Sequence, residues 1–202
     1  MKLYGTTTSP YARLTRVVLF EKNLGDQVEL IWTKTRVADD PILNVHPSGR
    51  VPVLVLENGT VFEDTPLIVD YLDTLSEPAR FTHSADRTDW RYREIEARAR
   101  AMIDGLSVWA REVVRSKVEQ SPGIIEHEAS RAYRLADHFE TLTGDLVLKG
   151  PLTMAQIYLF GSLDVERRLP AFAWRQGRPN LVAWFERVSA LPSVMASAPP
   201  PG

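Results

Sequence analysis

Residues 46–54 read HPSGRVPVL, and Pro52 in this stretch falls where an apolar strand begins. A trans proline at that place removes a hydrogen-bond donor from the strand ladder, whereas a cis Val51–Pro52 bond fixes a tight turn before the strand. We therefore expect a cis bond, with the backbone groups of Val51 turned outward from the sheet. A strand start with a trans bond is the alternative that the stretch alone leaves open.

The residues around this stretch alternate between strand and helix patterns. Period-two and helical spacing predict, in order, strand 1–4, helix 10–22, strand 28–32, a short helix at 39–43, strands 53–56 and 61–62, and helix 65–75. The dipeptide Asn58-Gly59 predicts a hairpin turn between the last two strands. This βαβαββα order favours a small mixed α/β sheet with helices on both faces and its first two strands parallel.

Strand patterns disappear after Pro78, and long helical patterns follow to the end of the chain. The apolar spacing predicts helices at 85–118, 125–142 and 155–165, and a further one around Leu181–Val188. We expect two domains, an α/β domain at 1–76 and an all-helical bundle at 85–202, joined by a linker at 77–84. A chain of this length suits two small domains.

Composition excludes several classes of partner and chemistry. The 202 residues carry a net charge of −2, which gives no electrostatic footprint for nucleic acid or an anionic membrane. No apolar stretch reaches the roughly 20 residues that span a bilayer. The chain has no cysteine, so it has no disulfide or thiolate metal site, and its four histidines show no metal spacing. We expect a cytoplasmic protein without a metal, whose partner is a small molecule or a protein.

Two further motifs open predicted helices. Ser9 before Pro10 has the features of an N-cap followed by a first-turn proline, after the first strand. Asp64-Thr65-Pro66 opens a later helix, where Thr65 is expected to cap and the free amides suit a carboxylate. The pair Glu63-Asp64 is the other possible acidic register. Simple helix capping explains both motifs equally well without a ligand.

The three segments in this order resemble the glutathione site of cytosolic glutathione S-transferases, and the resemblance covers essentially the whole chain. It implies a thioredoxin-like N-terminal domain and an all-helical C-terminal domain. The Ser-Pro-Tyr start is similar to bacterial and tau-like members, whereas omega-like members have cysteine in place of Ser9. The resemblance implies that Ser9 contacts the glutathione sulfur. In theta-like relatives the serine stands one place earlier, at Thr8, and Thr7 is another donor nearby.

The same resemblance assigns the other glutathione contacts. The backbone of Val51, before Pro52, is implied to pair with the cysteinyl part of glutathione, as a small case of strand addition. Asp64 and Thr65 are implied to hold the γ-glutamyl ammonium and carboxylate. The glycyl carboxylate needs a cation, for which we favour Arg50 over the neighbouring basic residues Lys34 and Arg36.

The helical domain is expected to supply the pocket for an electrophile. The candidates in this domain are Trp109, Arg111 and Arg115. Tyr11 of the first domain is a further candidate. Core packing is the more frequent role of an aromatic residue on a helix. Thr153 and Gln156 resemble a capping box before the apolar helix at 155–165, with glutamine in place of the usual acid.

These features predict a glutathione transferase, with glutathione as co-substrate, that activates the thiol and conjugates it to an electrophile in detoxification. The missing cysteine argues against a mixed disulfide between enzyme and glutathione. Two alternatives stay open: a non-catalytic protein-binding module similar to the stringent starvation proteins, and a glutathione-dependent isomerase or dehalogenase. Members of the superfamily are usually homodimers, so we expect a homodimer.

Overall fold

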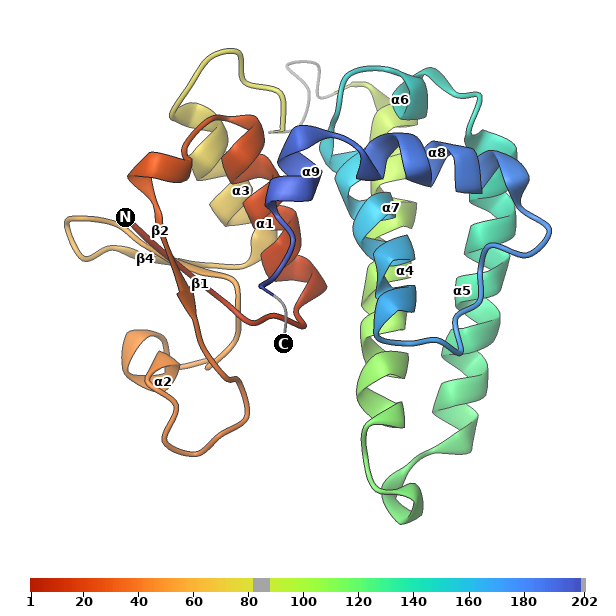
Figure 1. Ribbon diagram of the computed structural model, residues 1–202, viewed down its shortest axis with the longest axis horizontal. Helices are drawn as coiled ribbons and strands as arrows, with labels where there is room; N and C mark the ends of the chain where they lie inside the picture. The colour runs from red at the N-terminus through yellow and green to blue at the C-terminus, as the bar shows by residue number, and fades with distance from the viewer. Residues whose placement is uncertain (82–87, 201–202) are drawn as a thin grey trace. The chain divides into compact units, whose positions relative to one another are not determined.

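The structure of the protein is a computed structural model that describes residues 1–81 and 88–200. The chain packs into two units, one made of Met1–Ala85 with Leu191–Gly202 and one made of Asp86–Ala190 (Figure 1). Residues 82–84 of the predicted linker at 77–84 and the predicted start of a helix at residue 85 lie outside the described residues. Each unit is described by itself below.

The first unit contains a four-stranded sheet in the order β2-β1-β3-β4. The strands are β1 (Lys2–Gly5), β2 (Glu29–Trp32), β3 (Val53–Val55) and β4 (Val61–Glu63). β1 pairs parallel with β2, and β3 pairs antiparallel with both β1 and β4. Thr60 accepts from Leu56 N–H at 2.8 Å across the tight turn, where Gly59 has a φ of 84°. The predicted mixed sheet and its hairpin are confirmed.

Three helices accompany the sheet: α1 (Pro10–Glu21), α2 (Ile42–Val45) and α3 (Thr65–Thr74). Helices α1 and α3 pack on each other, and α2 lies on the other side of the sheet from them (Figure 1). Leu3 and Leu54 face each other across β1 and β3 and are fully covered, which places the core under α1 and α3. The short helix begins at Ile42 rather than at the predicted residue 39, because Asp40 and Pro41 form the turn before it.

A buried ion pair fastens the ends of α1 and α3. The Lys22 ammonium lies 3.0 Å from Asp73, and both side chains are almost completely covered. Lys22 also donates to the carbonyls of Ser76 and Pro78, while Asp73 accepts from the amides of Arg80 and Phe81. Each charge therefore has several hydrogen-bond partners, which offsets the cost of removing it from water.

The end of the chain packs with the first unit. Helix α9 (Pro192–Ala196) contacts α1, and Ser197 after it accepts from Arg13 Nε through its hydroxyl at 3.3 Å and from Arg16 Nε through its carbonyl at 3.1 Å. The sequence pattern assigns this segment to the helical domain instead. A five-residue helix carries too little periodicity to reveal which sheet or bundle it covers.

The second unit is helical throughout its described part. Its helices are α4 (Trp90–Val113), α5 (Pro122–Leu142), α6 (Leu146–Lys149), α7 (Met154–Asp164) and α8 (Pro179–Ser189). Residues 154–163 of helix α7 are all buried, as its uniformly apolar sequence predicts, and α7 contacts α4, α6 and α8 (Figure 1). The long helix α4 ends at Val113, five residues before its predicted end, so Arg115 follows the helix.

The predicted capping box before α7 is wrong. Thr153 makes no side-chain cap, and Gln156 donates through Nε2 to the carbonyls of Gly150 at 3.2 Å and Pro151 at 2.7 Å. The side chain of Gln156 therefore extends past the cap position and is hydrogen-bonded to the loop before α7. None of the helices in 1–81 and 88–200 is long and apolar enough to cross a membrane.

Replacing Asp73 tests the ion pair. Asp73→Ala leaves Lys22 as an uncompensated buried charge, so we expect the free energy of unfolding to fall by about 3–5 kcal/mol in urea titrations. Asp73→Asn keeps an acceptor for the amides of Arg80 and Phe81 and should lose less. The exposed Asp26→Ala is the control, with a change of about 0.5 kcal/mol or less. Equal stability of Asp73→Ala and the wild type would contradict this role.

Candidate functional site

Strand register brings the three predicted segments to one edge of the sheet. Tyr4, near the end of β1, pairs with Val53, at the start of β3, and Val53 pairs with Glu63, at the end of β4. The residues that follow β1 and β4 and the residues that precede β3 therefore meet at the same edge. Helices α1 and α3 both begin there, so their positive N-terminal ends face this edge.

Ser9 begins α1 in the predicted way. It is the N-cap, its Oγ accepts from Ala12 N–H at 3.2 Å, and Pro10 occupies the first turn. A hydroxyl that accepts in this bond still has its own proton to donate. Ser9 is half-buried, so its hydroxyl combines a fixed position with access from outside.

The loop before Ser9 is held by a residue that the sequence pattern did not single out. Thr6 Oγ1 accepts from the Ser9 N–H at 3.0 Å. Thr7 and Thr8 are exposed, and the Thr8 hydroxyl lies 3.5 Å from that of Thr6. Ser9 is thus the most firmly positioned hydroxyl of this loop, and Thr8 stands directly beside it in the chain.

The Val51–Pro52 bond is cis, as the sequence predicts. Val51 precedes β3, and among the described residues its N–H and C=O make no hydrogen bond to another backbone group. Arg50 is exposed, and its backbone N–H donates to Ser48 Oγ at 3.2 Å, while its guanidinium has no partner in the described part of the chain. The backbone N–H and C=O of Val51 and the guanidinium of Arg50, which have no such partners among the described residues, therefore belong to neighbouring residues.

Asp64, not Thr65, caps α3. Asp64 has a φ of 75°, and its Oδ1 accepts from the Thr65 N–H at 2.9 Å. With a ψ of 136°, Asp64 lies outside the left-handed helical region that aspartate adopts more readily than most residues do, so this conformation costs backbone energy. Thr65 is consequently the first helical residue, and its side chain turns inward. The cap of α3 therefore lies at Asp64, one residue before the predicted Thr65.

The Thr65 hydroxyl is an unsatisfied polar group. Thr65 is 2% exposed, and its Oγ1 has no hydrogen-bond partner among the described residues. A buried hydroxyl without a partner costs about 1–3 kcal/mol, so proteins seldom retain one without a use for it. Its place at the positive end of α3 makes an anionic ligand a suitable partner.

Asp40 organises the loop that follows β2. Its carboxylate accepts from the Thr33 hydroxyl, from Ile42 N–H at 2.9 Å and from Lys34 N–H at 2.8 Å. The Thr33 hydrogen bond, followed by that of Ile42, lowers the pKa of Asp40 below its usual value. The sequence pattern did not single out Asp40, although Asp-Pro is a typical turn start.

The basic residues of this loop are exposed. Lys34 and Arg36 both lie in it, and Arg36 has a φ of 73°. The Asp40 hydrogen bonds fix the backbone at Lys34, whereas Arg50 lies next to Val51. Arg50 is adjacent in the chain to Val51, whose backbone N–H and C=O are unpaired among the described residues. This adjacency favours Arg50 as the cation of the site.

The helical-unit candidates differ in burial. Trp109 is 3% exposed, and its ring packs edge-to-face on Tyr133 and Phe172. This packing favours a core role for Trp109 over a ligand pocket. Arg111 is exposed, with Nε donating to the Ser107 carbonyl at 2.9 Å, and Arg115 is exposed beyond the helix end.

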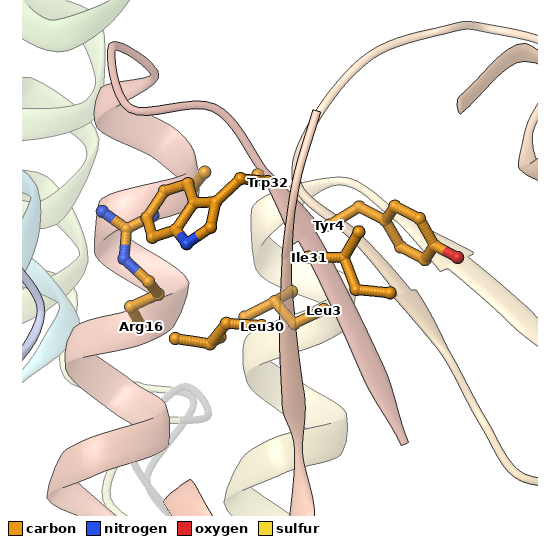
Figure 2. A pocket seen from close by; sticks show the side chains of 8 residues that line it. Leu3, Tyr4, Arg16, Leu30, Ile31 and Trp32 are labelled. Atoms are coloured by element: carbon orange, nitrogen blue, oxygen red, sulfur yellow. The ribbon is translucent and has the colours of Figure 1, made fainter. Parts of the chain in front are cut away.

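A small cavity in the first unit lies apart from these residues. It has a volume of about 10 Å³, room for about one water, and is lined by β1, β2 and α1. Figure 2 shows the Arg16 guanidinium against the ring of Trp32, at 4.8 Å from its centre. Burial, with a smaller contribution from Arg13, lowers the pKa of Arg16 to about 10. None of Ser9, Val51 and Thr65 lines this cavity.

Comparison with known proteins gives the family. Residues 8–75 match the glutathione S-transferase N-terminal domain, and residues 126–192 match the glutathione S-transferase C-terminal domain. The chain is 31% identical to the uncharacterized GST-like protein YibF of Escherichia coli K12, over 99% of each chain. The protein belongs to the glutathione S-transferase family, and this membership supports a glutathione transferase function.

Solved structures agree in fold. A glutathione transferase family member from Pseudomonas fluorescens Pf-5, with bound glutathione, is 26% identical over 99% of each chain, with a TM-score of 0.87. A glutathione S-transferase from Methylobacillus flagellatus KT, also with glutathione bound, is 26% identical over 98% of each chain, with a TM-score of 0.86. The predicted thioredoxin-like domain and helical domain are thereby confirmed.

Among residues 1–81 and 88–200, no group of three or more histidine or acidic side chains is arranged to hold a metal ion.

The pH dependence of stability tests the Asp40 loop. A lowered pKa in the folded state stabilises the protein above the unfolded value of about 3.9, and this contribution is lost as the pH falls through the folded value. We expect Asp40→Asn to be less stable than the wild type in urea at pH 7, with the difference shrinking below pH of about 4. The exposed Asp39→Asn is the control. A difference that stays constant with pH would contradict this assignment.

Proposed function

We propose that the protein is a serine-type glutathione transferase that binds glutathione at the edge where β1, β3 and β4 meet. The observation that carries this proposal is the Thr65 hydroxyl, which is buried at the positive end of α3 without a partner. The γ-glutamyl carboxylate of glutathione supplies the missing acceptor. The exposed carboxylate of Asp64 beside it accepts from the ligand's ammonium group.

The cysteinyl and glycyl parts of glutathione bind to the segment before β3. The cysteinyl part pairs with the N–H and C=O of Val51, which have no backbone partner among the described residues. The glycyl carboxylate binds the guanidinium of Arg50. Glutathione is thereby held at three points, and the extended tripeptide presents its sulfur toward the start of α1.

Ser9 donates a hydrogen bond from its hydroxyl to the glutathione sulfur and so stabilises the thiolate. A thiol with a pKa near 8.5 is only about 3% ionised at pH 7, and lowering that pKa by about two units needs roughly 2.7 kcal/mol. A hydrogen bond to an anion contributes about 1.5–3 kcal/mol, and a helix N-terminus adds about 0.3–1 kcal/mol. Ser9, as the N-cap of α1, combines both effects.

The bound thiolate then attacks an electrophile. The enzyme contributes by holding the thiolate in position and by stabilising its charge before attack. Tyr11, on the first turn of α1, is proposed as a contact of the electrophile. We also propose that the protein is a cytoplasmic homodimer, as members of this family usually are.

Glutathione titration calorimetry with Thr65 variants tests the site. Thr65→Val removes the hydroxyl at nearly constant volume, so we expect glutathione affinity to fall about 10- to 100-fold, as for a hydrogen bond to a charged group. Stability without ligand should stay equal or rise, because an unsatisfied buried group is removed. The exposed Thr60→Val is the matched control.

The outcomes of this titration are distinct. Binding of about one glutathione per chain by the wild type, weakened in Thr65→Val and kept in Thr60→Val, supports the proposal. Absence of wild-type binding at millimolar glutathione would leave the fold and overturn the transferase function, in favour of a protein-binding module.

Thiolate absorbance against pH tests Ser9. We expect Ser9→Ala to raise the pKa of bound glutathione by about two units and to lower kcat at pH 7 about 25-fold, because the thiolate fraction falls from roughly 76% to about 3%. Ser9→Ala also loses a cap worth about 1 kcal/mol, so Ser9→Asp, which keeps an N-cap acceptor but cannot stabilise a thiolate, separates the two effects. It should be as inactive as Ser9→Ala and more stable. If Ser9→Ala stays active and Thr8→Ala does not, the role belongs to Thr8.

A further inference from the structure

A cluster of three polar side chains joins two of the segments that form the candidate site. His46 and Ser48 lie in the loop between α2 and β3, and Glu63 is the last residue of β4. Ser48 Oγ donates to Glu63 Oε2 at 2.6 Å, and His46 Nδ1 lies 3.0 Å from the same carboxylate oxygen. The sequence pattern gives Glu63 only as an alternative acidic position, and the family resemblance gives it no role.

Ser48 is the centre of this cluster. Its hydroxyl donates to Glu63 and accepts from the backbone N–H of Arg50 at 3.2 Å, so both capacities of one oxygen are used. The bond to a carboxylate is charge-assisted and short. The position of the Arg50 backbone is thereby tied to the end of β4.

His46 adds to the cluster through a single nitrogen. Ser48 N–H donates to His46 Nδ1 at 3.2 Å when the ring proton is on Nε2, and Nδ1–H donates to Glu63 when it carries the proton. These two bonds use the same atom and exclude each other. His46 Nδ1 also lies 3.0 Å from Ser48 Oγ. The Ser48 hydroxyl therefore donates to Glu63 when Nδ1 carries a hydrogen, and it has two acceptors in reach, Nδ1 and Glu63, when Nδ1 does not.

The loop also contacts helix α2, at Gly49. This residue has a φ of 60°, and a Cβ built on it would lie 2.7 Å from Leu43 Cδ2. Leu43 of α2 therefore packs directly on the Gly49 backbone, while Ser48 is bonded to β4. With both contacts in place, the backbone of Arg50 and Val51 has little freedom to shift.

We propose that Glu63 is a positioning residue for glutathione, which acts through Ser48 to hold Arg50 and Val51 in register with Asp64 and Thr65. Glu63 immediately precedes Asp64, so one residue links the segment that holds the glycyl and cysteinyl parts to the segment that holds the γ-glutamyl part. This inference rests on the proposed glutathione site. Glu63 itself does not touch the ligand.

Steady-state kinetics with Glu63 and Ser48 variants test this role. We expect Glu63→Ala to raise the KM for glutathione about three- to ten-fold and to leave kcat at saturating glutathione within about two-fold, because Ser9 and α1 are untouched. Glu63→Gln keeps an acceptor for Ser48 and should restore much of the affinity. Ser48→Ala should raise the KM for glutathione as much as Glu63→Ala does. The double variant should have a KM no higher than that of either single variant. Glu57→Ala, an exposed acid on the same hairpin, is the control.

Hydrogen exchange without ligand separates this inference from the proposed function. Glu63→Ala should increase exchange of the amides of residues 48–51 and leave α3 unchanged. Faster loop exchange together with the KM effect supports the inference. Unchanged loop exchange overturns it, whether or not the wild type binds glutathione, and so do additive effects of Ser48→Ala and Glu63→Ala. If the wild type does not bind glutathione at all, the proposed function fails, and the positioning role for that ligand fails with it.

Discussion

The antiparallel pairing of β3 with both β1 and β4 is the constraint on which the candidate site depends. Each of these strands has only three or four residues, so a shift of two positions would separate the segments that follow them. Because Tyr4, Val53 and Glu63 share one row of the sheet, the start of α1, the turn at Pro52 and the start of α3 converge. Three segments distant in the chain thereby become neighbours.

The chemistry of this edge is complementary to a zwitterionic peptide. Two helix N-termini and the Arg50 guanidinium supply positive potential, and Asp64 adds one exposed carboxylate. The backbone of Val51 supplies a donor and an acceptor between them. A ligand with two carboxylates and one ammonium group on an extended backbone matches this order, whereas a plain anion offers no donor to the Asp64 carboxylate and no backbone partner to Val51.

Local rules in the sequence predict most of the fold. Ser9-Pro10 defines the start of α1, Asn58-Gly59 defines the hairpin, and the cis bond before Pro52 follows from a proline at a strand start. Each of these depends on residues within a few positions of one another. The same holds for α7, whose apolar surface on every side predicts that other helices cover it.

The features that could not be predicted depend on distant contacts or on one backbone angle. The cap of α3 at Asp64 instead of Thr65 goes with a positive φ at Asp64, which its sequence neighbours do not specify. The bond between Ser48 and Glu63 joins residues 15 positions apart across the sheet. The buried aromatic environment of Trp109 is formed by residues from another helix and a distant loop.

The return of the last helix to α1 has a consequence for biosynthesis. Arg13 and Arg16 of α1 bond to Ser197, so the first unit is assembled from both ends of the chain, with the helical unit inserted between them. While the ribosome is still making residues 86–190, these two guanidinium groups lack their partner at Ser197. The sheet can form early, but α1 reaches its final packing only after residue 197 has left the ribosome. In this protein the helix that carries Ser9 is therefore among the first to be made and among the last to be completed.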